Sequence, residues 1–258
     1  MLPSLFVSHG SPMLAVTPSP AHDFLTGLAA ALPRPRAILV ASAHWGTAAP
    51  AVNAVAANRT IHDFGGFPRE LYSLQYAAPG DPALAEEVAD RIGAAGLPVS
   101  LDRARGLDHG AWVPLMLAWP DAAIPVLQVS IQPHLGPAHH LELGRALAGL
   151  RERDILVIGS GAFTHDLRRF RGQALQTPET GDVTAFADWM DTALAEGRRC
   201  DLLTYRHKAP YAEAEHPTEE HLLPLFVAMG AGGSDLNVER LHASTEYGML
   251  RMDAYAFH

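Results

Sequence analysis

Short apolar runs, many of them rich in β-branched residues, alternate with longer helical segments along this chain. Such runs are typical of strands, and several lack the polar alternation of a sheet with one wet face, so burial on both faces is expected. The expected strands cover residues 5–7, 38–41, 51–56, 124–131, 155–158, 237–242 and 249–255.

Helical segments lie between these runs and carry start and stop signals. The segment 81–96 opens with Asp81 as a cap and Pro82 at the first helical position, and it closes on a glycine. Further helices are expected over 136–150, 180–197 and 217–230. This order predicts an α/β fold: a single domain over 1–258, with a mixed, mostly parallel central sheet flanked by helices.

Composition restricts the partners of the chain. Hydrophobic residues make up 48% of the 258 residues, which is enough for a sizeable core. The net charge of −9 argues against a nucleic acid or an anionic membrane surface as partner. The one cysteine, Cys200, excludes an intrachain disulfide, and neither a signal peptide nor a membrane-spanning run is found. A cytoplasmic location is expected, and the oligomeric state is left open, with a homodimer as one option.

Histidine is unusually frequent, and three of the 14 histidines follow predicted strands. His9 and His44 come at the ends of the first two, each close to a glycine, and His165 follows 155–158 after a short turn. A lone histidine of this kind is more often a structural residue. However, parallel strands place their carboxyl ends at one edge, where ligands of α/β sheets bind. The repeated position therefore predicts a site at that edge, and histidine is the commonest metal ligand.

Two further motifs carry histidines. In "GLDHGAW", His109 sits in a turn before a helix, and Asp108 either orients its imidazole or caps the helix. In "HPTEEHLLPL", Pro217 suits a first helical residue and His221 then falls in the second turn. This stretch offers a histidine or a glutamate as a third ligand, but it is not the zinc pattern HExxH.

The loop "IHDFGGFP", residues 61–68, is expected to line a pocket with His62 and Phe64 as substrate contacts. Phe67 and Trp45 are further candidate walls. The stretch "GSGAF" around Ser160 does not satisfy the nucleophile motif GxSxG, because Ile158 and Ala162 occupy the glycine positions.

The ordered motifs "LFVSHGSPM", "VASAHW", "IHDFGGFPRELYSLQYAAPGDP", "GLDHGAWVPL", "VLQVSI", "GSGAFTHDLR" and "PTEEHLLPL" extend over nearly the whole chain. Together they resemble the class III extradiol ring-cleavage dioxygenase superfamily, in its DOPA 4,5-dioxygenase-like branch. The resemblance implies an α/β fold with one non-haem metal, and an enzyme that opens the ring of a small aromatic diol with O2.

By the same resemblance, the metal ligands are His9, His44 and His221, with His165 as an optional fourth. Glu219 and Glu220 remain rivals for the third position. His165 and His109 match the catalytic histidines, and His109 also contacts substrate. Fe(II) with three protein ligands keeps positions open for a catecholate and O2.

Two other functions stay open at this point. The same histidines suit Zn(II), which is redox-inert, and a zinc-dependent hydrolase would use Glu219 or Glu220 as a base. A non-catalytic binding homologue is the second alternative. The native metal, the particular catechol and the bond cleaved are not determined by the sequence.

Overall fold

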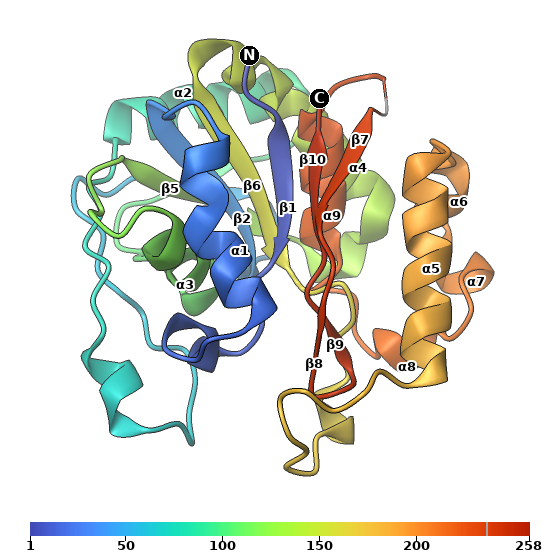
Figure 1. Cartoon of the computed structure of the whole chain (residues 1–258). Helices are drawn as coiled ribbons and strands as arrows, with labels where there is room; N and C mark the ends of the chain where they lie inside the picture. Colours follow the sequence, from blue (N-terminus) through green and yellow to red (C-terminus); the bar gives the residue numbers. More distant parts are fainter. Residues whose placement is uncertain (236) are drawn as a thin grey trace.

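The computed structural model describes residues 1–235 and 237–258, and its framework is one eight-stranded sheet (Figure 1). The strands lie in the order β4 (Ser100–Asp102), β3 (Ala51–Asn53), β5 (Val126–Ile131), β2 (Ala37–Gly46), β6 (Ile155–Gly161), β1 (Ser4–Ser8), β10 (Ala254–Phe257) and β7 (Val238–His242). A separate hairpin pairs β8 (Thr245–Glu246) with β9 (Leu250–Arg251).

The central strands β5, β2, β6 and β1 are all parallel, whereas β10 pairs antiparallel with both β1 and β7. The mostly parallel mixed sheet that the sequence predicts is therefore confirmed. β1, β5 and β6 are buried along their whole length, as expected for strands covered on both faces.

Helices cover both faces of the sheet. Their bounds are α1 (Pro20–Leu28), α2 (Pro82–Ala94), α3 (His109–Ala118), α4 (Gly136–Leu147), α5 (Gly181–Ala195), α6 (Arg199–Leu203), α7 (Tyr205–Lys208), α8 (Ala212–Glu215) and α9 (Leu223–Ala231). Among the described residues, no helix combines the length and apolar character that crossing a bilayer requires.

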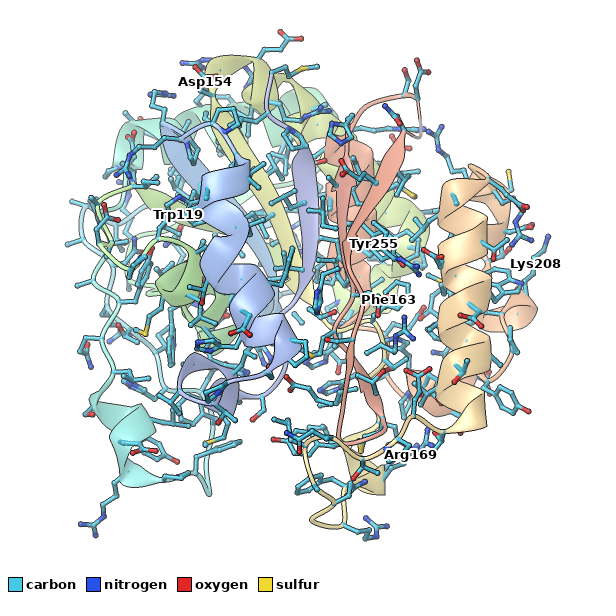
Figure 2. All side chains as sticks on the ribbon, in the orientation of Figure 1. Trp119, Asp154, Phe163, Arg169, Lys208 and Tyr255 are labelled. Atoms are coloured by element: carbon cyan, nitrogen blue, oxygen red, sulfur yellow. The ribbon has the colours of Figure 1, made fainter. Side chains whose placement is uncertain are left out.

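Two hydrophobic cores lie on opposite faces of the sheet. Alternate residues of β1 separate them: Phe6 faces the core that includes α4, α5 and α9, while Leu5 and Val7 face the core that includes α1 and α3. In the first core, the ring centroids of Phe163 and Tyr255 lie 5.4 Å apart in the interior (Figure 2).

The helix expected over 217–230 begins only at Leu223, so the expectation was wrong for residues 217–222. α9 begins at Leu223, and the residues before it form turns. The carbonyl of His221 accepts a hydrogen bond from the backbone N–H of Ala162, at 2.9 Å, instead of joining a helical ladder. Pro224 has no N–H to donate, so it suits the first turn of the helix that follows.

Candidate metal centre

His9 and His44 reach the same edge of the sheet because β1 and β2 are parallel and flank β6. His9 directly follows β1, and its backbone N–H donates to the carbonyl of Gly161 at 2.9 Å. His44 lies within β2, where the register against β5 slips between Ala41 and Gly46. Such an irregularity re-aims side chains, and here His44 projects from it.

The turn after His9 depends on Gly10, which has φ of 59°. A Cβ there would also lie 2.7 Å from Cε of Met252, so glycine fits both the backbone angle and the space. Gly46 near His44 differs, because a Cβ would meet only Pro133 at 3.5 Å, an ordinary contact. The backbone angle and the available space therefore require glycine at Gly10 but not at Gly46.

His221 reaches the site because its segment is fixed to the end of β6. Its carbonyl oxygen accepts the N–H of Ala162, and a Cβ at Gly161 would lie 2.0 Å from that oxygen. Gly161 therefore permits an approach that any larger residue would block.

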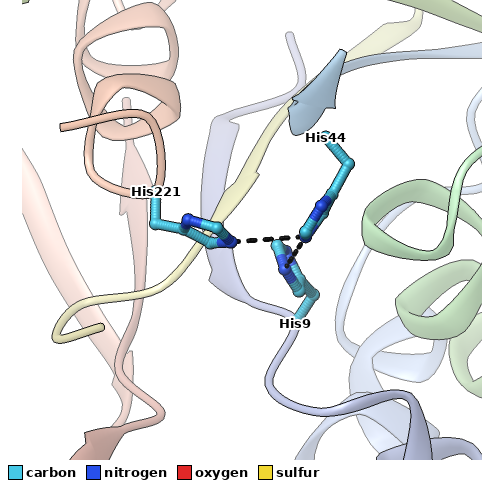
Figure 3. A group of neighbouring side chains, drawn as sticks. All are labelled: His9, His44 and His221. Carbon is cyan, nitrogen blue, oxygen red and sulfur yellow. Dashed lines mark hydrogen bonds between the residues drawn. The ribbon is translucent and has the colours of Figure 1, made fainter. Parts of the chain in front are cut away.

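The three side chains converge through their Nε2 atoms (Figure 3). Nε2 of His9 lies 3.0 Å from Nε2 of His44, which lies 3.3 Å from Nε2 of His221. His9 and His221 are buried, and the side chain of His44 is 22% exposed. These three nitrogens form a group with the spacing that a metal ion needs.

Hydrogen bonds on the outer ring nitrogens indicate which nitrogens carry protons. The hydroxyl of Ser160 donates to the carbonyl of Gly110 at 2.5 Å, so its oxygen is free to accept from Nδ1 of His9 at 3.0 Å. Nδ1 of His221 donates to Oε1 of Glu220 at 3.1 Å. A neutral imidazole has one N–H, so Nε2 of His9 and of His221 both carry lone pairs.

Lone pairs that face one another are unfavourable without a cation between them. Even a proton on Nε2 of His44 would bond only one of its two neighbours. Burial lowers the pKa of His9 and of His221 well below the usual value, and the neighbouring histidines lower both further. Burial also lowers the pKa of His44, to about 4. Three neutral nitrogen donors therefore fit a metal ion.

Neither rival glutamate belongs to the convergent group. Glu220 contacts Nδ1 of His221, on the ring edge opposite the ligand atom. It forms a second potential cluster with His165 and His221. Oε1 of Glu219 is buried without a hydrogen-bond partner among the described residues.

His109 begins α3 and is 6% exposed, so it is not a residue of the outer surface. Asp108 caps the helix through the N–H of Ala111 and is itself fully buried. Its carboxylate also accepts from Ser42, Gln128 and Arg105, at 2.6, 2.8 and 2.9 Å. These bonds fix the start of α3, and with it the backbone of His109.

His165 stacks on His221, with ring centroids 3.4 Å apart and planes at 12°. Its backbone N–H donates to the carbonyl of Glu215 at 2.8 Å. Burial lowers the pKa of His165, so its ring is neutral at pH 7. His165 is outside the group formed by His9, His44 and His221.

A pocket of about 430 Å³ opens beside the converging nitrogens. Its lining includes His9, His44, His109, His165 and His221. The rest of its wall is mainly apolar and is formed by Gly10, Ser11, Pro12, Met13, Phe64, Phe67, Ala162, Leu167, Phe170, Tyr247, Met249, Leu250 and Met252.

Two residues expected at the pocket lie elsewhere. Nε2 of His62 bonds the carbonyl of Leu74 at 3.0 Å, and His62 is not among the residues that line the pocket. Trp45 is buried beneath the guanidinium of Arg105, whose carbon lies 5.3 Å from the ring centroid. Phe64 and Phe67 do line the pocket.

Sequence reasoning missed several residues of this site. The test of "GSGAF" against a nucleophile motif does not reveal the role of Ser160, whose place near the end of a predicted strand is the signal that the sequence offers. Asp63 belongs to the loop that the sequence predicts at the pocket, but no sequence pattern indicates that its carboxylate contacts two histidines. Leu167, Phe170 and Tyr247 reach the pocket through tertiary folding, and no local pattern marks them.

Comparisons with known proteins agree with this geometry. The family described as the catalytic LigB subunit of aromatic ring-opening dioxygenase matches residues 3–258. A 4,5-DOPA dioxygenase extradiol from Beta vulgaris is 44% identical over 263 residues, covering 98% of this chain and 96% of its own. One from Escherichia coli K12 is 40% identical, covering 89% and 85%.

A crystal structure of an uncharacterised protein from Escherichia coli K12 superimposes with a TM-score of 0.83 at 33% identity, and each chain is covered completely. The family match and the relatives do not favour a hydrolase. The chain therefore belongs to the aromatic ring-opening dioxygenase family of the LigB catalytic subunit, as a ring-cleaving enzyme of the extradiol type.

Proposed function

We propose that this dioxygenase opens the ring of a small catechol of the DOPA type, using Fe(II) held by His9, His44 and His221. The observation that carries this proposal is the convergence of three Nε2 atoms beside a mainly apolar pocket. The relatives from Beta vulgaris and Escherichia coli are named for 4,5-DOPA, which makes L-DOPA the first substrate to test.

Enzymes of this family depend on a non-haem metal, and the histidine cluster offers a place for it. Fe(II) would supply the redox chemistry that lets dioxygen react with a catechol. Zn(II) suits three histidines equally well but has no redox chemistry, so zinc-loaded protein would be inactive.

The pocket residues would bind and orient the ring. Phe64 stands edge-on to His109, with ring centroids 5.7 Å apart and planes at 89°. Phe64, Phe67, Leu167 and Phe170 give the pocket much of its apolar wall. A planar ring held against this wall would direct its two hydroxyls towards the histidines.

His165 and His109 would manage the protons. A neutral His165 is able to accept a proton from a catechol hydroxyl and return it later, and proton transfer of this kind is efficient near neutral pH. His109, which also lines the pocket, would hydrogen-bond the substrate. The cytoplasmic location stays a prediction of the sequence, and a homodimer stays one option for the oligomeric state.

Oxygen uptake tests this proposal. Protein loaded anaerobically with Fe(II) is mixed with L-DOPA, unsubstituted catechol and 4-methylcatechol, while dioxygen and the yellow ring-opened product are followed. Uptake that depends on iron and is lost in His9→Ala supports the proposal. Full iron occupancy without uptake on any catechol contradicts it.

A further inference from the structure

One carboxylate, that of Asp63, contacts two histidines of the site at once. Its Oδ1 lies 3.0 Å from Nδ1 of His109 and also accepts the backbone N–H of His109 at 2.9 Å. Its Oδ2 lies 3.6 Å from Nδ1 of His44. Asp63 thus links the end of β2, which carries a predicted metal ligand, to the first residue of α3.

The loop that carries Asp63 is itself fixed to α3 and to the segment before it. The N–H of Ile61 donates to the carbonyl of Leu107 at 2.8 Å, and Nε1 of Trp112 donates to the carbonyl of Ile61 at 2.9 Å. The carboxylate is therefore anchored on the element whose histidine it contacts. An anchored acceptor of this kind sets the orientation and tautomer of an imidazole.

The contacts of Asp63 indicate which nitrogens of His109 and His44 remain free to bind substrate or metal. An ionised carboxylate only accepts hydrogen bonds, so a proton on Nδ1 is favoured in both histidines. Nδ1 of His109 lies 3.0 Å from Oδ1 of Asp63, but the pair lacks the geometry of a hydrogen bond, and this nitrogen has no hydrogen-bond partner among the described residues. Nε2 of His109 is then the unprotonated atom, on the side of the ring away from Asp63, and Nε2 of His44 is the one that meets His9 and His221.

We propose that Asp63 is a positioning residue that holds His109 and His44 with Nδ1 protonated, so that one Nε2 serves the substrate and the other serves the metal. This inference rests on the proposed function for the roles of the two histidines. Asp63 itself touches neither the substrate nor the metal in this account.

A rival role exists, because His44, Asp63 and His109 also lie close enough to bind an ion, with ligand atoms within 4.8 Å of one another. In that role Asp63 would be a ligand of a second metal. Wild-type protein would then bind two ions per chain, and Asp63→Asn would bind one. The positioning role predicts one ion in both proteins.

The test begins with the tautomers. In zinc-loaded, 15N-labelled protein, long-range proton–nitrogen spectra report which nitrogen of each imidazole is protonated, and His109 is assigned by comparison with His109→Gln. We expect Nδ1–H for His109 in the wild type, and a mixture or Nε2–H in Asp63→Ala. Nε2–H already in the wild type would overturn the proposal without any variant having to fold.

Kinetics then show whether the tautomer matters. In iron-loaded Asp63→Ala and Asp63→Asn, kcat for the best catechol should fall about 10- to 100-fold, the usual cost of losing the partner of a functional histidine. Iron content should stay at one per chain, and the KM for the catechol should change less than kcat. An unchanged kcat in a variant whose His109 tautomer has switched would overturn the proposal.

Asp166→Asn is the matched control. Asp166 is adjacent to His165, but its carboxylate pairs with Arg168 at 2.7 Å, and no hydrogen bond or ion pair joins it to an imidazole of the described residues. This variant should leave the tautomer of His109 unchanged. The same tautomer change in Asp166→Asn as in Asp63→Ala would overturn the proposal.

The tautomers are read in zinc-loaded protein and need no dioxygenase activity. They therefore test the role of Asp63 even if no catechol consumes oxygen, and failure of this proposal is distinguishable from failure of the proposed function.

Discussion

His9 and His140 are both buried, but their ring nitrogens meet different partners. Nδ1 of His140 donates to the carbonyl of Gly136 at 2.7 Å, and its Nε2 accepts the N–H of Gln132 at 3.0 Å. His9 has an acceptor only on Nδ1, and its Nε2 faces the Nε2 of His44. Burial lowers the pKa of both. Burial therefore does not identify the site, whereas nitrogens that face each other without a donor between them do.

Removing one converging histidine should have the largest effect. His221→Ala leaves two nitrogens in the group, so the affinity for Fe(II) or Zn(II) should fall by more than about 100-fold, the upper cost of losing only a partner of a ligand. Metal titration with a competing chelator measures this. His140→Ala is the control: it should lose folding stability while binding one metal ion. Full metal binding by His221→Ala would show that the facing nitrogens do not identify the metal site.

The second prediction concerns stability and pH. Burial lowers the pKa of His140 from about 6.5 to about 4. Between these values the unfolded chain binds more protons, so the contribution to stability is complete above pH 6.5 and is lost as the pH falls towards 4. That loss amounts to about 3 kcal/mol for this one residue.

Urea unfolding of metal-free protein at a series of pH values measures this effect. The wild type should lose its advantage over His140→Gln as the pH falls from 6.5 to 4. Parallel curves for the two proteins would mean that the pKa of His140 is the same in the folded and unfolded chains, so that burial does not keep its ring neutral.

Ser160→Ala should have a smaller effect. The variant removes the acceptor for Nδ1 of His9, so metal affinity should fall about 10- to 100-fold. Ser4→Ala is a matched control. Ser4 is also buried, but it lies at the start of β1, at the opposite end from His9, where its hydroxyl donates to the carbonyl of Ala228 at 2.7 Å. Equal metal affinities for the two variants would show that Ser160 does not orient His9.

Glu220→Gln should have the smallest effect. The new amide keeps an oxygen that accepts from Nδ1 of His221, so metal affinity should change by less than about 10-fold, the lower cost of losing such a partner. Metal content after dialysis should stay at one ion per chain. Metal-free Glu220→Gln would instead identify the glutamate as a ligand.

The sequence predicted the main parts of this site because they depend on strand ends. His9 and His44 come from parallel strands on either side of β6, and apolar runs that end on histidine indicate that edge directly. The resemblance that includes "PTEEH" indicates His221 as a ligand, but the helix expected around His221 is wrong, because α9 begins at Leu223. The bond between its carbonyl and Ala162 joins residues far apart in the sequence, so no local pattern shows it.

The direction of side chains in loops was harder to predict. His62 and Asp63 are neighbours in one loop, yet His62 bonds the carbonyl of Leu74 while Asp63 reaches two histidines. Which of them faces the site depends on how the loop is held against α3, and that is a tertiary contact. Leu167 and Phe170 also reach the pocket wall through tertiary contacts, so the local sequence does not predict their place there.

Anomalous diffraction from crystals grown anaerobically with Fe(II) locates the metal relative to the three converging histidines. We expect one iron peak per chain, at bonding distance from Nε2 of His9, of His44 and of His221. A peak between His44, Asp63 and His109, or one bound through Glu220, would contradict this expectation.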